Sequence, residues 1–128
     1  MKKLLALLAT AAISLNAIAG EFPDISISEV RSLVASKKAV IIDVNGSDSY
    51  RKGHVPGALD FESVSGNLAK ALPEDKKTLI VAYCGGPRCK AYQAAASAAE
   101  KLGYKNVKHM SAGIAGWKSA GEKLEAKK

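Results

Sequence analysis

The sequence predicts an α/β domain with a mostly parallel central sheet and helices on both faces of that sheet. Two observations lead to this fold class. Apolar, β-branched runs alternate along the chain with segments of helical composition, which is the pattern of parallel strands connected by helices. The run at residues 39–44 is apolar almost throughout, as expected for a strand that is buried on both faces.

The first predicted helix covers residues 27–36. Ser26 and Glu29 have the spacing of a capping box, in which each side chain accepts a hydrogen bond from a backbone amide that the start of a helix leaves unpaired. The buried face of this helix should carry Val30, Leu33 and Val34. The strand at 39–44 follows directly.

Short elements separate this strand from the next buried one. Gly53 and Gly57 can take positive φ, and Pro56 holds Val55 extended, so a turn is expected at residues 53–58. Around this turn we expect, in order, a helix at 47–52, a strand at 58–61, a weak helix at 62–72 with Leu68 and Leu72 inward, and a buried strand at 78–83.

The last third of the chain begins with an alanine-rich helix at residues 90–102. Alanine is a strong helix former, and Gly103 stands where helices commonly end. Side chains this small allow the helix to lie close to the sheet. The remaining predicted elements are a strand at 107–110, a short helix at 113–119 around Trp117, and a frayed last helix from Gly121. Trp117 should be a core residue or a cap on the sheet edge.

The N-terminus has the pattern of a secretory signal peptide. Lys2 and Lys3 precede an apolar run at 4–15 and a small-residue triplet at 17–19. The run is shorter than the roughly 20 residues that span a bilayer, and it lacks the polar face of an amphipathic anchor. We expect residues 1–19 to be removed, leaving residues 20–128 as one periplasmic domain that is free of the membrane.

The charge of the chain is mildly basic. Removal of the leader lowers the count of Lys and Arg from 19 to 17 against 12 Asp and Glu, so the formal charge falls from +7 to +5. The lysines are scattered among acidic residues and follow no aromatic stripe, so we expect no nucleic-acid partner. A modest positive field still favours small anionic substrates. The mature length suits a single core, and we expect a monomer.

Residues 83–92 carry both cysteines of the chain, Cys84 and Cys89. Cys84 follows a predicted strand and precedes a predicted helix, which is where parallel sheets bind ligands. If the chain curls around its sulfur, backbone N–H groups stabilise a thiolate or persulfide there. Such a setting lowers a cysteine pKa from ~8.5 to roughly 4–7. The residues expected to line this cradle are Gly85, Gly86, Pro87, Arg88, Cys89 and Lys90.

The two cysteines allow several other interpretations. A purely structural disulfide is disfavoured, because closing so short a loop contributes about 2 kcal/mol at most. No metal is expected, because His54 and His109 are distant in the sequence and match no zinc spacing. A phosphatase-like cradle is disfavoured, because Lys90 lacks a planar guanidinium. Cys89 remains a candidate resolving thiol that attacks a Cys84 persulfide or sulfenate and leaves a disulfide.

Five landmarks in order along the mature chain resemble those of a single rhodanese domain. They are Asp43-Val44 at a strand end, the turn from Gly53 to Ala58, the segment Tyr83-Cys84-Gly85-Gly86, the pair Gly103-Tyr104, and Gly113-Ile114 with Trp117. The resemblance covers nearly the whole mature chain. It implies a rhodanese-like fold without a cofactor, in which Cys84 is the nucleophile and Asp43 and His54 are framework residues near the active loop.

The resemblance also implies a reaction. Cys84 would take a sulfane sulfur from a small anionic donor such as thiosulfate and pass it, as a persulfide, to a thiol or other nucleophilic acceptor. The active loop departs from the family pattern, which commonly has glycine three residues and often arginine five residues after the cysteine, where this chain has Pro87 and Cys89. Arg88 and Lys90 are therefore the candidate contacts for the donor, and Arg88 is better shaped for a two-point contact.

Two other functions fit the same residues. A non-catalytic sulfur-carrier or binding module would use the loop without turnover. A thiol-disulfide redox protein would instead cycle the Cys84-Cys89 pair. Sulfur transfer is the interpretation that the residues and the resemblance favour together.

The leader makes a prediction about the mature chain. Signal peptidases cut after small residues, so a periplasmic extract should contain a protein whose first residue is Gly20. N-terminal sequencing or intact mass of the purified protein measures this. Recovery with Met1 intact, or from membranes alone, would contradict the predicted export.

Overall fold

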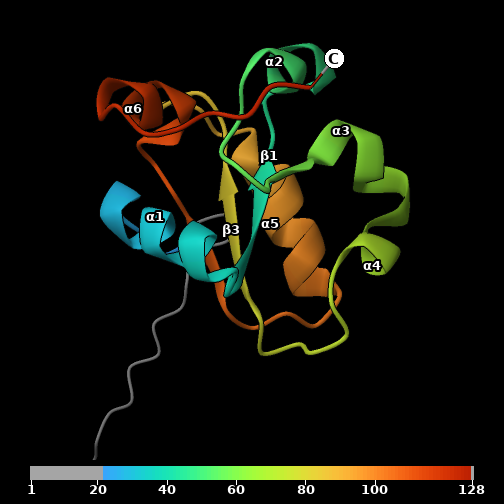
Figure 1. Ribbon diagram of the computed structural model, residues 1–128. Helices are drawn as coiled ribbons and strands as arrows, with labels where there is room; N and C mark the ends of the chain where they lie inside the picture. Colours follow the sequence, from blue (N-terminus) through green and yellow to red (C-terminus); the bar gives the residue numbers. More distant parts are fainter. Residues whose placement is uncertain (1–21, 128) are drawn as a thin grey trace, which may run out of the picture.

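The computed structural model describes residues 22–127, and these contain a four-stranded, fully parallel sheet. The strand order is β2-β1-β3-β4, with β1 at Ala39–Asp43, β2 at Leu59–Asp60, β3 at Leu79–Tyr83 and β4 at Val107–His109. Because the strands are parallel, their carboxyl ends meet at one edge of the sheet (Figure 1). The leader predicted at 1–19 lies outside the described residues.

Helices connect these strands and lie on both faces, so the predicted fold class is confirmed. The helices are α1 (Ile27–Ser36), α2 (Ser47–Lys52), α3 (Phe61–Val64), the 3-10 helix η1 (Ser65–Asn67), α4 (Leu68–Ala71), α5 (Tyr92–Lys101) and α6 (Gly113–Ser119). The prediction of a single helix at 62–72 is wrong. It is divided into α3, η1 and α4, because Gly66 and Asn67 favour non-helical backbone. The boundaries of the other predicted elements up to α6 agree within two residues.

One face of the sheet is covered by α1 and α6 (Figure 1). Ile41 of β1 and Val81 of β3 are buried there, together with Val30 from α1 and Trp117 from α6. Leu33 and Val34 are only partly buried, at the margin of this cluster. Of the two expected positions for Trp117, core or cap on the sheet edge, the structure shows the core.

The opposite face packs against α5 and α4. Ala95, Ala96 and Ala99 turn toward the sheet and are fully buried, and they meet strand residues that include Ile42 and Ile80. Leu68 and Leu72 are buried in the same cluster, as predicted. Small side chains therefore let α5 lie directly on the sheet, behind the strand that leads to the cysteines.

The predicted helix ends are largely confirmed. The hydroxyl of Ser26 accepts a hydrogen bond from the amide of Glu29 at 3.1 Å, and the Glu29 carboxylate accepts one from the Ser26 amide at 3.2 Å. Gly103 follows α5 with φ of +103°. In the turn, Gly57 has positive φ as expected, whereas Gly53 is extended at 170° and uses no left-handed backbone.

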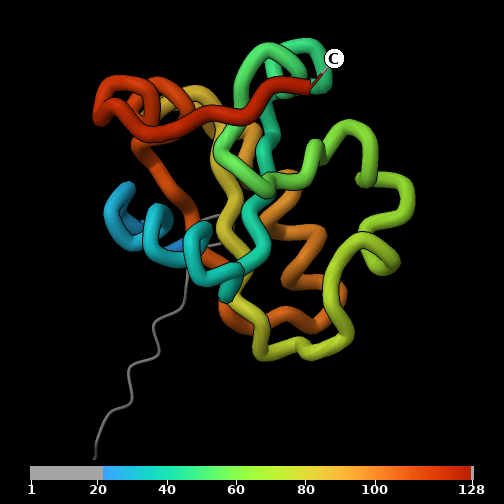
Figure 2. The backbone as a smooth tube through the Cα atoms, viewed as in Figure 1, coloured from blue at the N-terminus to red at the C-terminus, as the bar shows by residue number. Residues whose placement is uncertain are grey.

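The chain after Gly121 is not a helix, and this prediction is wrong. The tail runs extended past α2 (Figure 2, red), where the amides of His54 and Glu125 each donate to the other's carbonyl at 2.9 Å. The amide of Lys127 donates to the carbonyl of Arg51 at 2.9 Å. The tail therefore satisfies its backbone groups by pairing with residues far away in the sequence, which local helix propensity does not register.

A segment that precedes α1 extends the sheet, and it was not predicted from the sequence. The amide of His109 donates to the carbonyl of Pro23 at 2.8 Å, and the amide of Ile25 donates to the carbonyl of His109 at 3.0 Å. This pairing covers the outer edge of β4, which would otherwise expose unpaired backbone groups. Within residues 22–127, no helix has the length and apolarity needed to cross a bilayer.

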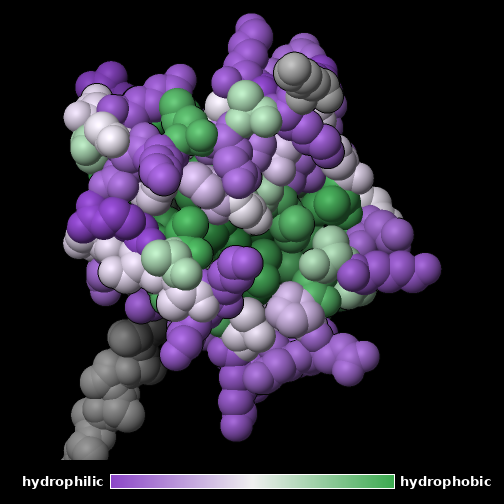
Figure 3. Space-filling model, in the orientation of Figure 1, coloured by the Kyte–Doolittle hydropathy of each residue, from purple (hydrophilic) through white to green (hydrophobic). Residues whose placement is uncertain are grey.

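A pocket of about 420 Å³ lies beside α1 and the turn after α2. In the space-filling view, apolar side chains appear in the middle of this side of the molecule, between polar side chains (Figure 3). The lining includes Val34, Ile41 and Ala39, the first residue of β1. The cysteines instead follow the last residue of β3, so the pocket and the cysteine loop are separate features.

Candidate active site

Cys84 comes immediately after β3, at the edge of the sheet where the carboxyl ends of the strands meet. Its side chain belongs to the cluster on the α5 face and is 1% exposed. Eight residues after Cys84, α5 begins at Tyr92, two residues after the position predicted for its start. A central parallel strand, a short loop and a helix start thus frame the Cys84 sulfur, in the position that α/β sheets use for ligands.

Cys84 and Cys89 are joined by a disulfide, with their Cα atoms 6.2 Å apart. The amide of Cys89 donates to the carbonyl of Gly86 at 3.1 Å, so the chain turns back at the tip of the loop. A purely structural disulfide was disfavoured on the sequence because closing so short a loop adds little stability, yet the bond is present. The turn brings the two sulfur atoms together, and the bond links the predicted nucleophile to the predicted resolving thiol.

The remaining loop residues divide by exposure. Gly85, Gly86 and Cys89 are half-buried, whereas Pro87, Arg88 and Lys90 are exposed. Cys84 therefore lies at the base of the loop and Cys89 lies nearer its rim. Two exposed cations flank Cys89, and a negatively charged molecule that approaches the loop meets them first.

The start of α6 holds the base of the loop. The amide of Ile114 donates to the carbonyl of Cys84 at 2.9 Å, and the amide of Ala115 donates to the carbonyl of Gly85 at 3.0 Å. Gly113 has φ of +65°, and a Cβ added there would lie 2.5 Å from the carbonyl carbon of Gly85. This contact was not predicted from the sequence, where residues 113 and 114 stood out only as the start of a helix and as a family landmark. The glycine that opens the helix was the available signal.

Asp43 anchors a buried chain of hydrogen bonds beside the loop. The Tyr83 hydroxyl donates to Asp43 Oδ2 at 2.5 Å and accepts from the amide of Val55 at 3.0 Å. Asp43 Oδ1 accepts from the amide of Asn45 at 2.8 Å. A Cβ on Gly85 would lie 3.8 Å from the Asn45 side-chain oxygen, so the Asn45 side chain lies beside the active loop.

The electrostatics of this chain follow from its burial. Loss of hydration raises the pKa of Asp43, and the hydrogen bonds from Tyr83 and Asn45 oppose that rise without cancelling it. Burial and the neighbouring Asp43 charge also raise the pKa of Tyr83, which therefore stays protonated and acts as a donor. These hydrogen bonds connect β1, β3 and the turn at Val55.

His54, the other framework candidate, contacts a different set of groups. Its Nδ1 lies 2.6 Å from the carbonyl of Tyr50, and its ring stacks on the Tyr50 ring with centroids 3.6 Å apart. Its Nε2 lies 3.6 Å from Glu125 Oε1. His54 thus connects α2 to the C-terminal tail, and these contacts give it a structural role.

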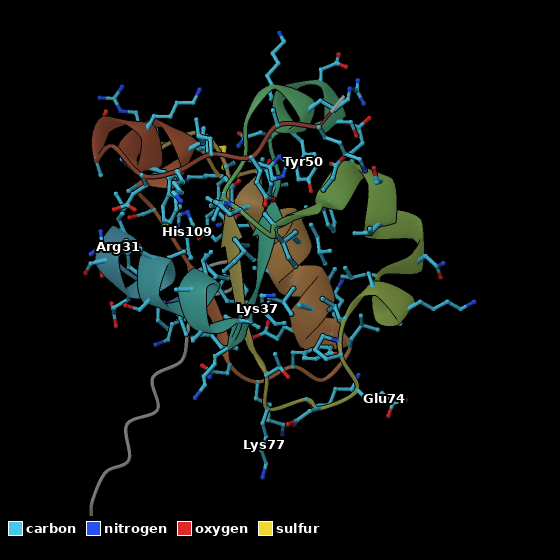
Figure 4. All side chains as sticks on the ribbon, in the orientation of Figure 1. Arg31, Lys37, Tyr50, Glu74, Lys77 and His109 are labelled. Atoms are coloured by element: carbon cyan, nitrogen blue, oxygen red, sulfur yellow. A yellow bond between two sulfur atoms is a disulfide. The ribbon has the colours of Figure 1, made fainter. Side chains whose placement is uncertain are left out.

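His109 stacks on Tyr92 at the start of α5, with ring centroids 3.4 Å apart. His109, labelled in Figure 4, is the last residue of β4. Burial lowers its pKa, so the ring is neutral, and its Nε2 has no hydrogen-bond partner among the described residues. Between residues 22 and 127, no group of three or more His, Cys, Asp or Glu could hold a metal ion.

The fold and the loop define a class of protein: an α/β domain that presents a cysteine at the carboxyl end of a central parallel strand. The sequence profile of the rhodanese-like domain matches residues 26–120. The chain belongs to the rhodanese-like domain family.

Similar proteins agree with this assignment. The chain is 34% identical over 108 residues to thiosulfate sulfurtransferase GlpE of Pseudoalteromonas translucida, a match covering 81% of this chain and 97% of that protein. It is 32% identical over 99 residues to the uncharacterized protein YibN of Escherichia coli, covering 75% of this chain and 66% of YibN. The solution structure of the rhodanese-like domain of Anabaena Alr3790 superposes with a TM-score of 0.66 at 24% identity, covering 81% and 79% of the two chains, and is alike in fold.

Replacement of Gly113 by alanine should destabilise the protein more than replacement of Gly121. Both glycines have positive φ, +65° and +77°, so each alanine costs about 1–2 kcal/mol in backbone energy. Only at Gly113 would the new Cβ overlap backbone, adding about 1–3 kcal/mol, whereas nothing lies within 4 Å at Gly121. Urea denaturation of both variants measures the difference. Equal losses would show that the contact with Gly85 is not tight.

The raised pKa of Asp43 predicts a pH dependence of stability. The folded protein binds a proton at Asp43 more readily than the unfolded chain does. Protonation of Asp43 therefore adds to the free energy of unfolding, and this added stability is complete at low pH. It is lost as the pH rises from the ordinary value of 3.8 through the raised value. Asp43→Asn cannot titrate, and the free energy of unfolding should fall less with rising pH than in the wild type. Urea denaturation at a series of pH values measures this slope.

The matched control for this measurement is Asp48→Asn. The Asp48 side chain is 89% exposed and pairs with Arg51 on the surface of α2. This variant should therefore keep the wild-type slope. An Asp43→Asn slope equal to that of the wild type would mean that burial does not raise the pKa of Asp43.

Proposed function

We propose that this protein is a sulfurtransferase that carries sulfur on Cys84 as a persulfide. The observation that carries the proposal is the position of Cys84, buried at the end of β3 in a loop whose base is held by the amides of α6. The similarity to GlpE, named a thiosulfate sulfurtransferase, along 97% of that protein's length supports the same reaction class.

The reaction begins with both cysteines reduced. The Cys84 thiolate attacks the outer sulfur of a thiosulfate-like donor, and the sulfur-sulfur bond of the donor breaks. Sulfite leaves with the electron pair, and the Cys84 sulfur keeps the transferred atom as a persulfide. A nucleophilic acceptor then attacks the outer sulfur and restores the Cys84 thiolate, in a double-displacement scheme.

The loop supplies the electrostatics of this reaction. Arg88 and Lys90 are exposed at the rim and provide positive charge for a donor sulfonate, and the Arg88 guanidinium suits a two-point contact. Gly85 and Gly86 leave space beside the sulfur because they carry no side chain. Backbone N–H groups of the loop and the start of α5 stabilise the negative charge of the persulfide.

The proposed setting is the periplasm, with the mature protein a monomer that is free of the membrane. The signal-peptide pattern at residues 1–19 supports export. An oxidising compartment also keeps cysteine pairs closed unless a reductant opens them, in agreement with the bond between Cys84 and Cys89.

A second candidate function is thiol-disulfide exchange. The Cys84-Cys89 disulfide favours it directly, because a pair in one loop can alternate between a dithiol and a disulfide. In this alternative Cys84 receives electrons rather than sulfur. A non-catalytic sulfur-carrier or binding module would use the same loop without turnover.

The proposal is tested by Cys84→Ser. A neutral hydroxyl cannot hold a sulfane sulfur, so the variant should lose thiosulfate-dependent sulfur transfer to an added thiol, by at least about 10³-fold as for other essential nucleophiles. Sulfite release and intact mass after exposure to thiosulfate are the measurements, and circular dichroism checks that the variant is folded.

Each alternative predicts a different result in this experiment. Retained activity in Cys84→Ser would remove Cys84 from the reaction. If the reduced wild type never gains sulfur from any donor but exchanges electrons with dithiols, the protein is a thiol-disulfide redox protein. A wild type that gains sulfur but never passes it on would leave the carrier module.

A further inference from the structure

The disulfide joins the proposed sulfur carrier to a second thiol within the same loop. We infer that Cys89 is the acceptor that resolves the Cys84 persulfide and releases its outer sulfur as hydrosulfide, so that turnover depends on a dithiol reductant. The inference rests on the proposed function and adds to it a product, sulfide, and a partner class. It assigns to Cys89 a direct role in the chemistry.

The geometry favours an acceptor within the chain. Cys84 is 1% exposed in the disulfide-bonded loop, and Cys89 is the thiol that the same loop brings to it. Cys89 needs no approach from solvent, because the hydrogen bond from its amide to the Gly86 carbonyl folds it back toward Cys84. A thiol tethered by so short a segment acts at an effective concentration of about millimolar or more.

The two cysteines are also held differently. The carbonyls of Cys84 and Gly85 accept hydrogen bonds from Ile114 and Ala115, which fix the base of the loop to α6. Cys89 follows the exposed tip formed by Pro87 and Arg88. When the disulfide opens, the Cys84 sulfur stays at the end of β3 while the Cys89 side can move outward and admit a donor.

The chemical step balances without a further oxidant. The Cys89 thiolate attacks Cys84 Sγ, the inner sulfur of the persulfide, and the bond between the inner and outer sulfur atoms breaks. The outer sulfur leaves with the electron pair as hydrosulfide and takes the proton of the persulfide or one from water. The sulfane sulfur is thereby reduced by two electrons, and the two cysteines are oxidised to the disulfide.

The bond in the closed loop is the bond that attack at the inner sulfur would form. In the structure Cys89 Sγ is bonded directly to Cys84 Sγ, which is the product of that attack. Attack at the outer sulfur would instead move the persulfide onto Cys89 and release no sulfide. The two routes therefore leave proteins of different mass, and an experiment can separate them.

A dithiol reductant completes the cycle. It attacks Cys89 Sγ, the more accessible sulfur, and the Cys84 thiolate leaves, ready for the next donor molecule. The second thiol of the reductant then attacks the reductant's own sulfur in this mixed disulfide, and Cys89 leaves as a thiolate. The reductant becomes a disulfide and has given two electrons to the cysteine pair. The exposed cations Arg88 and Lys90 flank this point of attack and suit a partner with an acidic surface around its thiols.

The test uses the mature protein reduced with a dithiol, desalted under argon and mixed with excess thiosulfate without any added thiol. The wild type should release equal amounts of sulfite and sulfide, one of each per chain, and end lighter than its reduced form by two hydrogens. Cys89→Ser should release sulfite but at least about tenfold less sulfide, and should end heavier by one sulfur atom. Cys89→Ala should behave in the same way, which excludes an effect of the serine hydroxyl.

Chemical rescue separates a missing thiol from a damaged loop. Addition of a small monothiol to sulfur-loaded Cys89→Ser should release the retained sulfide, because it replaces the acceptor that the variant lacks. A variant that forms the persulfide but resists the monothiol would indicate that the loop, rather than the Cys89 thiol, controls release, and would overturn the inference.

Failure of the inference and failure of the proposed function give different results. If the wild type releases sulfite but keeps the added sulfur and releases no sulfide, sulfur transfer stands and resolution by Cys89 is wrong. The same holds if peptide mapping finds the persulfide on Cys89. If the wild type releases neither sulfite nor sulfide and gains no sulfur, the sulfurtransferase proposal fails and the inference fails with it.

Discussion

The close approach of α6 to the loop after β3 is the contact on which the rest of the site depends. Two amides of α6 donate to the carbonyls of Cys84 and Gly85, and a glycine at position 113 is the residue that lets the backbones come this near. Any side chain there would push the loop away from the helix. The backbone of the loop at Cys84 and Gly85 is therefore held in place by contacts with the start of α6.

A buried polar chain provides the second constraint. Asp43, Tyr83 and the Val55 amide link β1, β3 and the turn before β2 in one sequence of hydrogen bonds. Burial of a carboxylate is unfavourable and raises the pKa of Asp43. The hydrogen bonds from Tyr83 and Asn45 offset part of that cost. The arrangement gives a defined geometry to the sheet edge on which the loop is built, at some expense in stability.

The disulfide leaves the two cysteines of the loop with different exposure to solvent. In the closed state Cys84 is covered and Cys89 lies at a rim that carries two exposed cations. The disulfide therefore shields the proposed nucleophile Cys84. It is the two-electron oxidised form of the cysteine pair, and a reductant would attack it at Cys89. A loop with one cysteine would perform only the first half of this chemistry and would depend on an external thiol for the second.

The sequence by itself determined the α/β class, the parallel strands, both ends of α1, the glycine that follows α5, and the place of Cys84 at a strand end, because periodicity, caps and loop composition are local properties. It did not determine the extended tail paired with His54, the strand-like segment beside β4, the contact of α6 with the loop, or the burial of the Asp43-Tyr83 pair. Each of these joins residues far apart in the chain. Their hydrogen bonds form only after the sheet has brought the partners together, so only the tertiary structure decided them.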